Sequence, residues 1–237
     1  MTRPFKFKQF SVQQEHSAMK IGTDGVLLGA WVSLKLQPSS ILDLGAGTGI
    51  ISLMMAQRSQ ANLIDAVEIE VAAFEECTNN FEASPWSDRL FCYHASVQEF
   101  AAEIEESYDL IVSNPPFYSE NVKSQEISRD VARFNDALPF EHLTVCAGKL
   151  LSSEGSFAVI IPKKEEGRFT ALASSSGLFP KRICHVQGKS NTPIKRSMME
   201  FTFVKGPVET TSLIIENSRH DYTLEYRELV QDFYLKM

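Results

Sequence analysis

The chain has 237 residues, of which 43% are hydrophobic and 22% are charged, a composition that is ordinary for a globular protein. Its four cysteines are widely spaced and form neither a Cys-x-x-Cys pair nor a Cys/His cluster, which argues against a disulfide framework and a zinc site. Because no uncharged apolar run reaches membrane-spanning length, we expect a soluble cytoplasmic protein without a membrane partner. We also expect it to hold no metal and to act as a monomer.

The net charge of −7 is unevenly distributed along the chain. Residues 60 to 110 carry twelve acidic residues and a single basic residue, whereas residues 180 to 207 and the first fourteen residues are basic. Basic segments of this kind suit RNA phosphates, but they suit the solvated face of a β-hairpin equally well. Charge alone therefore leaves a nucleic-acid partner open.

The first forty residues predict a segment that precedes the main alternation of strands and helices. Residues 1 to 20 lack a clear periodicity and suggest a short strand pair or an arm. Residues 22 to 31 predict a buried helix, with Thr23 or Asp24 as its cap. We treat residues 1–40 as an N-terminal cap segment on a catalytic core of residues 41–237, within one domain.

A glycine-rich turn follows the first predicted strand, which covers residues 41–44. Gly45, Gly47 and Gly49 lead into a helix that begins near Ile50, and glycines let a ligand approach the bare backbone. A dinucleotide fingerprint requires its third glycine where Ile50 stands, which weakens a pyrophosphate interpretation. The second predicted strand ends at Glu68, where a carboxylate can accept both hydroxyls of a ribose.

Strands and helices continue to alternate through most of the remaining chain. The pattern predicts a helix at 71–81, a strand at 89–93, an acidic helix or loop at 99–106, a strand at 108–113, a mobile loop at 118–135, a helix at 139–153 ended by Gly155, a strand at 156–161, a helix at 165–175, strands at 179–186, 198–204 and 212–216, and a last helix capped by Thr223. This order favours one doubly wound, mostly parallel sheet with helices on both faces, finished by antiparallel strands.

The fourth predicted strand stops abruptly at Asn114, Pro115, Pro116 and Phe117. The prolines cannot continue a hydrogen-bond ladder, Asn114 offers an acceptor and two donors, and Phe117 offers a flat apolar face. A stiff turn would explain the four residues equally well. In a doubly wound sheet, however, ligands bind outside the carboxyl ends of the strands, so we expect Asn114 to share a crevice with the glycine turn and Glu68.

Taken together, residues 43–49, Glu68 and residues 114–117 resemble the motifs of class I S-adenosylmethionine-dependent methyltransferases that modify planar amines. Within that class, residues 23–31 and 233–237 resemble the bacterial family that methylates N6 of the adenine beside the anticodon of valine tRNA. The similarity spans nearly the whole chain. It implies a Rossmann-like α/β fold with a seven-stranded sheet, S-adenosyl-L-methionine as cofactor and tRNA as substrate.

The resemblance also implies roles for individual residues. Asn114 and the Pro115 carbonyl would accept the hydrogens of the target amine, and Phe117 would stack on the base beside Pro116. At Ser96 the family usually has an acid that contacts the cofactor adenine, so a hydroxyl or the Val97 backbone would serve there. The implied cofactor-binding residues are Thr23, Asp24, Asp43, Gly45, Ala46, Gly47, Gly49, Glu68, Ile69, Ser96, Val97 and Asn114. The candidate phosphate-binding residues are Lys6, Lys8, Arg133, Lys189, Lys195 and Arg196.

Other functions share parts of this pattern. The Asn-Pro-Pro-aromatic motif also serves guanine N2 in rRNA, glutamine N5 in proteins and adenine N6 in DNA. A nicotinamide-dependent oxidoreductase is disfavoured by Ile50 and by the Asn-Pro-Pro end of the fourth strand. A noncatalytic RNA-binding protein on the same fold is disfavoured by intact Asn114 and Glu68.

Overall fold

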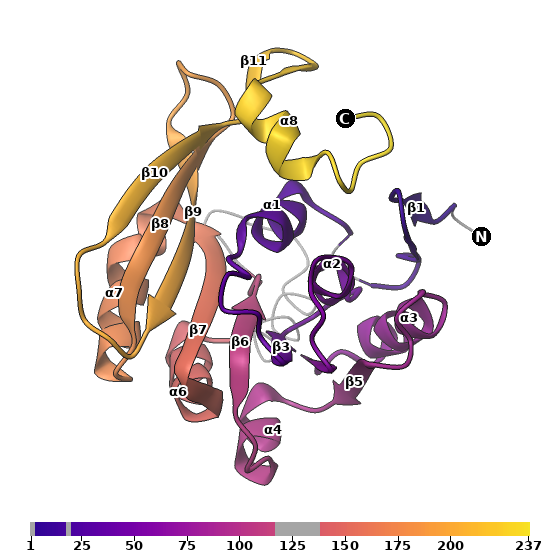
Figure 1. The fold of residues 1–237 in the computed structure, drawn as a ribbon, viewed down its shortest axis with the longest axis vertical. Coiled ribbons are helices and arrows are strands. Elements are labelled where there is room, and N and C mark those ends of the chain that lie inside the picture. The colour runs from indigo at the N-terminus through magenta and orange to yellow at the C-terminus, as the bar shows by residue number, and fades with distance from the viewer. Residues whose placement is uncertain (1–2, 18–19, 117–137) are drawn as a thin grey trace, which may run out of the picture.

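The structure is a computed structural model that describes residues 3–17, 20–116 and 138–237. At its centre lies an eight-stranded sheet with the strand order β10-β8-β9-β7-β6-β3-β4-β5 (Figure 1). The strands are β3 (Ser40–Leu44), β4 (Leu63–Glu68), β5 (Leu90–His94), β6 (Tyr108–Ser113), β7 (Leu151–Pro162), β8 (Phe179–Gln187), β9 (Ile194–Thr202) and β10 (Glu209–Ile214). The α/β fold with a mostly parallel sheet is confirmed, and the sheet has eight strands where seven were expected.

Only β9 runs against its neighbours in this sheet, because it pairs antiparallel with both β7 and β8. The expected set of antiparallel final strands is therefore wrong in part: β10 pairs parallel with β8 from Glu209 to Ile214. Since β9 ends at the edge where β8 begins, the chain starts β10 at that same edge. The sequence pattern predicted only the buried end of this strand, because Glu209 to Ser212 are exposed.

Helices cover both faces of the sheet. On one face pack α1 (Thr23–Trp31), α2 (Ile50–Arg58), α3 (Val71–Glu82) and α8 (Leu224–Val230), and on the other α4 (Val97–Glu103), α6 (Phe140–Leu150) and α7 (Glu166–Ser175), the last preceded by the 3-10 helix η1 (Lys163–Glu165). Successive residues of the central strands alternate between the two cores, as Ala158 and Val159 do. Residues 157–161 of β7 are fully buried between the two layers of helices, and each of the larger side chains among them contributes about 1.5–3 kcal/mol by its burial.

The boundary between α6 and β7 differs from the prediction. The helix ends at Leu150 and the strand begins at Leu151, so Gly155 lies inside β7 and does not end the helix. The pairing of β6 with β7 is irregular there, since Tyr108 faces Leu151 while Leu110 faces Ser156. A Cβ on Gly155 would lie 3.0 Å from the Asp109 carbonyl oxygen, so close backbone approach explains the glycine.

Two short strand pairs flank the sheet. The N-terminal pair of β1 (Phe5–Lys6) and β2 (Ser11–Val12) confirms the expected strand pair, and β11 (Glu216–Ser218) pairs with β12 (Asp221–Tyr222). The two ends of the chain meet, because the Phe7 ring stacks on Tyr234 with centroids 5.8 Å apart. None of the described helices is long and apolar enough to cross a membrane.

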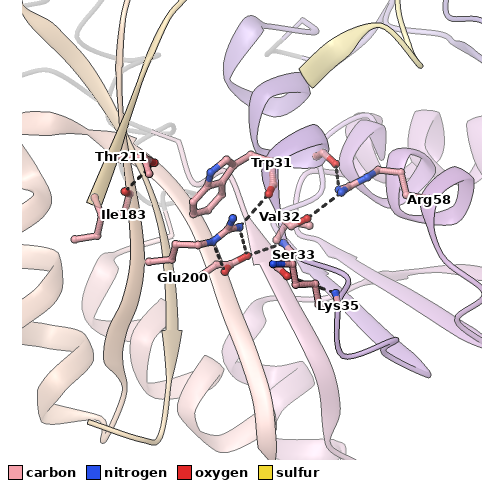
Figure 2. Close-up of polar contacts among 10 residues, drawn as sticks. Trp31, Val32, Ser33, Lys35, Arg58, Ile183, Glu200 and Thr211 are labelled. Atoms are coloured by element: carbon pink, nitrogen blue, oxygen red, sulfur yellow. Dashed lines mark hydrogen bonds and ion pairs between the residues drawn. The ribbon is translucent and has the colours of Figure 1, made fainter. Parts of the chain in front are cut away.

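The C-terminal end of α1 is fixed to the sheet by a partly buried ion pair. Arg182 of β8 binds both carboxylate oxygens of Glu200 on β9 at 2.9 Å, lies 4.0 Å from the Trp31 ring centre and donates to the Trp31 carbonyl. Glu200 also accepts the Ser33 N–H at 2.6 Å, so the strand and the helix end face each other across this contact (Figure 2). On the opposite side, Arg58 donates to the carbonyls of Gly29 and Val32, which the end of a helix leaves without partners.

Candidate active site

The glycine-rich turn after β3 has the backbone conformation that its residues predict. Gly45, Gly47 and Gly49 have φ angles of +73°, +57° and +77°, in the left-handed region that other residues rarely adopt. A Cβ on Gly49 would lie 2.5 Å from a ring carbon of Phe81, so this glycine also allows α2 and α3 to pack closely. The turn therefore presents backbone at the carboxyl end of β3, next to the first turn of α2.

Glu68, the last residue of β4, points its carboxylate at this turn. One oxygen accepts the Gly47 N–H at 2.8 Å, and the other accepts the Glu70 N–H at 2.9 Å. The side chain is buried, with 8% of its surface exposed. Each carboxylate oxygen can accept a further hydrogen bond, so Glu68 is held in place by backbone donors and still has the capacity to bind a diol.

Asp43 lies beneath the turn, between β3 and α2. It is fully buried, and its Oδ2 accepts the N–H and the hydroxyl of Ser52 at 3.2 and 2.8 Å. Its Oδ1 has no hydrogen-bond partner among the described residues. Burial, only partly opposed by the bonds from Ser52, raises the pKa of Asp43 to about 7.

Asn114 stands at the carboxyl end of β6, on the other side of β3 from Glu68. The end of β6 is tied to β3 because the Ser113 hydroxyl donates to the Leu44 carbonyl at 2.7 Å. The Asn114 Oδ1 atom is buried and has no hydrogen-bond partner among the described residues. An unpartnered buried acceptor is costly, so Asn114 at this strand end is a candidate binding group.

A cleft of about 390 Å³ joins these features, a volume within the range of small-molecule sites. Of the residues predicted for the site, it is lined by Gly45, Ala46, Gly47, Glu68, Ile69, Ser96, Val97, Asn114 and Pro116. Thr23, Asp24, Asp43, Gly49 and Pro115 are absent from that lining. Phe117 lies outside the described residues. The expected crevice between the glycine turn, Glu68 and Asn114 is thus present.

Comparison with known proteins identifies the family. Residues 17–174 match the methyltransferase small domain family, which covers more than half of the chain. A protein of Christiangramia forsetii named tRNA1(Val) (adenine(37)-N6)-methyltransferase is 58% identical over 99% of both chains. Proteins with the same name are 42% identical in Bacteroides fragilis, over the full length of both chains, and 38% identical in Yersinia pestis, over 98% of this chain and 93% of that protein. The chain belongs to the methyltransferase small domain family.

Solved structures agree with this methyltransferase assignment at the level of the fold. The crystal structure of a predicted O-methyltransferase from Agrobacterium tumefaciens superposes with a TM-score of 0.70, at 18% identity, over 89% of this chain and 96% of that chain. A precorrin-6y C5,15-methyltransferase from Geobacter metallireducens gives a TM-score of 0.54, at 14% identity, over 81% and 92%. The class I methyltransferase fold and S-adenosyl-L-methionine as its cofactor follow from these likenesses together with the family. The described residues contain no His, Cys, Asp and Glu group that could hold a metal ion.

Ser96, which the resemblance places near the cofactor adenine, caps α4. Its hydroxyl accepts the Glu99 N–H at 3.1 Å and donates to the Glu99 carboxylate, which in turn accepts the Ser96 N–H. This arrangement is a capping box, in which the hydrogen bonds of the Ser96 hydroxyl are made to the first turn of α4. Contact of Ser96 or Val97 with the cofactor adenine stays a prediction, and both residues line the cleft.

The first turn of α1 contributes residues that the sequence analysis missed. Gly22 and Gly25 line the cleft of the methyltransferase, and a Cβ on Gly25 would lie 3.9 Å from the Asn114 amide nitrogen. The glycines recur one turn apart, a spacing that could have suggested the helix face next to the ligand. The expected cap is wrong, because Gly22 is the N-cap without a side-chain bond, and Asp24 instead pairs with Arg196 of β9 at 2.7 Å.

The candidate phosphate-binding residues divide between two places. Lys189 follows β8, while Lys195 and Arg196 begin β9, with Arg196 opposite Pro162 at the carboxyl end of β7. This is the edge of the sheet where Asn114 lies. By contrast, Lys6 and Lys8 lie in the N-terminal strand pair region, and Lys8 donates to the Gln231 carbonyl beside the far end of α2. Arg133 lies outside the described residues.

Proposed function

We propose that this methyltransferase transfers a methyl group from S-adenosyl-L-methionine to the N6 amine of an adenine in tRNA, the adenine next to the anticodon of valine tRNA. Relatives of that name align with the chain over almost its whole length. The structural observation that carries the proposal is the buried, unpartnered Oδ1 of Asn114 at the cleft. An amine is the kind of group that such an acceptor would hold.

The cleft fits the cofactor in its donor and acceptor groups. S-adenosyl-L-methionine supplies an electrophilic methyl group on its sulfonium. Glu68 would accept the ribose hydroxyls with the lone pairs that the Gly47 and Glu70 N–H groups leave free. Ile69, the next residue, has 43% of its surface exposed and would offer an apolar side chain to the adenine. Its backbone is held in place because its carbonyl oxygen lies 3.0 Å from His94 Nε2.

The chemistry at the target nitrogen requires acceptors more than a strong base. The lone pair of an exocyclic adenine amine is delocalised into the ring, and it becomes nucleophilic as the nitrogen pyramidalises. Asn114 Oδ1 and the Pro115 carbonyl would each accept one N–H and stabilise the positive charge that develops there. Phe117 would stack on the base and keep the nitrogen in line with the methyl group. Transfer of the methyl group would leave N6 positively charged and therefore acidic, and it would lose one of its two protons to water.

A base in an anticodon loop is easier to bring into this cleft than a base in a duplex, because it is already partly unstacked. Lys189, Lys195 and Arg196 would bind phosphates of the anticodon arm, since they share the edge of the sheet with Asn114. Lys6, Lys8 and Arg133 would bind phosphates elsewhere on the tRNA. With tRNA as its substrate, we expect the enzyme to act in the cytoplasm and as a monomer.

The test is incubation with labelled S-adenosyl-L-methionine and unmodified bulk tRNA, followed by nucleoside mass spectrometry and purification of valine tRNA. We expect one labelled N6-methyladenosine per valine tRNA. The absence of labelled N6-methyladenosine from the tRNA would contradict the proposal.

A further inference from the structure

Two buried polar side chains of α3 are not explained by the binding groups described above. Glu76 and Asn80 are 4% and 1% exposed, and they lie one helical turn apart, so both face the same side of the helix. Polar residues of this kind are rarely buried unless they have partners. Their neighbours in sequence are the same two residue types, Glu75 and Asn79, and both of those are exposed.

The Glu76 carboxylate binds the backbone of a segment about sixty residues earlier in the chain. Its Oε1 accepts the His16 N–H at 2.6 Å, and its Oε2 accepts the Ser17 N–H at 2.8 Å. The Ser17 hydroxyl donates to Oε2 as well. Burial opposes ionisation, but these hydrogen bonds outweigh it and lower the pKa of Glu76, so the carboxylate is charged at neutral pH.

The Asn80 amide joins the same segment to the glycine-rich turn. Its Oδ1 accepts the Gln13 N–H at 2.7 Å, and its Nδ2 donates to the carbonyls of Gln13 and Thr48 at 3.0 and 2.9 Å. Thr48 belongs to the turn that lines the cofactor cleft. One side chain therefore fixes the N-terminal segment relative to the cofactor-binding backbone.

The segment held in this way reaches the cleft itself. Ser17, Lys20, Ile21 and Gly22 all line the cleft, on the side of the α1 first turn. The Lys20 ammonium donates to the carbonyls of Gln14, Glu15 and Ser17, which draws the segment into a compact shape. Nearly all polar contacts of Glu76 and Asn80 go to backbone atoms, so they fix the path of the segment more than its side chains.

We propose that Glu76 and Asn80 are positioning residues that hold residues 13–17 so that Ser17 stays in the wall of the cofactor cleft, and that part of the affinity for S-adenosyl-L-methionine depends on the docking of this N-terminal segment. The segment is bound through exchangeable hydrogen bonds, whereas the inner face of α3 packs through apolar residues such as Cys77 and Phe81. Loss of the polar bonds therefore releases the wall and leaves the core in place.

The test compares matched substitutions on one helix. Glu76→Gln keeps the volume but turns one acceptor oxygen into a donor, and Asn80→Ala removes the bridge to Gln13 and Thr48. Glu75→Gln and Asn79→Ala are the controls. We expect the dissociation constant of S-adenosyl-L-methionine, measured by calorimetry, to rise about tenfold in the first two variants and less than twofold in the controls.

Limited proteolysis distinguishes local release of this segment from general unfolding, which would expose cleavage sites throughout the chain. Release of residues 1–20 by trypsin, followed by mass spectrometry, should be faster in Glu76→Gln than in the wild type, and the cofactor should protect the wild type but not this variant. At saturating cofactor, kcat should be near that of the wild type while KM for the cofactor is raised. If Glu76→Gln does not fold, Ser17→Ala, which removes a single hydroxyl donor, should show the same effects at about twofold to threefold.

Unchanged cofactor affinity in Glu76→Gln, with or without faster release of residues 1–20, would overturn the proposal. An equal loss of affinity in Glu75→Gln would also overturn it, because it would indicate a general effect of charge. The calorimetric and proteolysis measurements require the cofactor but no RNA, so they are independent of whether tRNA is the substrate.

Discussion

The carboxyl edge of the sheet has two halves, one around β3 and β4 and the other around β8 and β9, and they use charged side chains in opposite ways. Around β3, β4 and α3, the acids Asp43, Glu68 and Glu76 are buried and accept hydrogen bonds from the chain's own backbone. At the turn between β8 and β9, Lys195 is exposed and Lys189 is half-buried. The ion pair of Arg182 and Glu200, which holds the end of α1, lies farther along these two strands, away from that turn. One half is preorganised around a small ligand, and the other presents charge to solvent.

This difference indicates how each half would bind its ligand. A small cofactor gains affinity when the groups that bind it are fixed before it arrives, because little entropy is then lost. A polyanion gains affinity from accessible cations that release counterions, and that binding depends strongly on salt. Substitutions in the two halves should therefore separate cofactor affinity from RNA affinity.

The largest effect is expected at Asn114, where the two halves meet. Asn114→Ala should reduce single-turnover methyl transfer to tRNA by on the order of a hundredfold or more, because a preorganised acceptor at the reacting nitrogen is removed. Cofactor affinity by calorimetry should change little, and Asn79→Ala, an exposed asparagine elsewhere, serves as the control. Wild-type turnover in Asn114→Ala would exclude the role assigned to its amide.

A large effect on the cofactor half alone is expected from Glu68→Gln. Replacing the carboxylate by an amide weakens charge-assisted hydrogen bonds to a diol and leaves one backbone N–H facing a donor. The dissociation constant of S-adenosyl-L-methionine should rise by roughly ten- to a hundredfold. Binding of unmodified tRNA without cofactor should stay unchanged; a matching loss of RNA affinity would mean that the two halves are not separable.

A smaller effect, confined to RNA affinity, is expected from removing the lysines at the turn between β8 and β9. The double variant Lys189→Ala, Lys195→Ala should bind tRNA several-fold more weakly at moderate salt, and the slope of log K against log salt should fall by about 1 for each phosphate that is no longer neutralised. Lys35→Ala, an exposed lysine after the opposite end of α1, is the control. An unaltered salt slope would remove these two lysines from the RNA surface.

The smallest effect concerns stability. Because burial raises the pKa of Asp43 from 3.8 to about 7, the folded state favours the protonated carboxyl, and stability from this group is lost as the pH rises from 4 through 7. Asp43→Asn removes that dependence while an amide oxygen can still accept from Ser52. Relative to the wild type, the variant should gain on the order of 2 kcal/mol in unfolding free energy between pH 5 and pH 8. Parallel pH profiles from urea unfolding would show that Asp43 does not titrate in this way.

The sequence predicted the parts of the site that follow from strand ends. Gly45, Glu68 and Asn114 each lie at the end of a strand whose apolar pattern is clear, and a doubly wound sheet brings such positions together. It did not predict the wall formed by Ser17 and Gly22, because that wall depends on side-chain bonds between residues far apart in the chain. Bonds of that kind leave no periodic pattern.

Local errors in the predicted elements have similar causes. Gly155 suggested a helix end, but its role is to let β7 pass close to Asp109 across an irregular strand pair. Asp24 suggested a helix cap, but its carboxylate pairs with Arg196 from the other half of the sheet. In both cases a contact with a residue far away in the chain, and not the local preference of the residue type, determined the structural role of the residue.

The most direct test of the account is a competition reaction with one limiting dose of labelled S-adenosyl-L-methionine and equal amounts of unmodified valine tRNA, ribosomal RNA, duplex DNA and total protein. The label should appear almost entirely as N6-methyladenosine in the anticodon loop of the tRNA, and Asn114→Ala should abolish it. Label that appears mainly in any of the other three acceptors, or that persists in Asn114→Ala, would contradict the account.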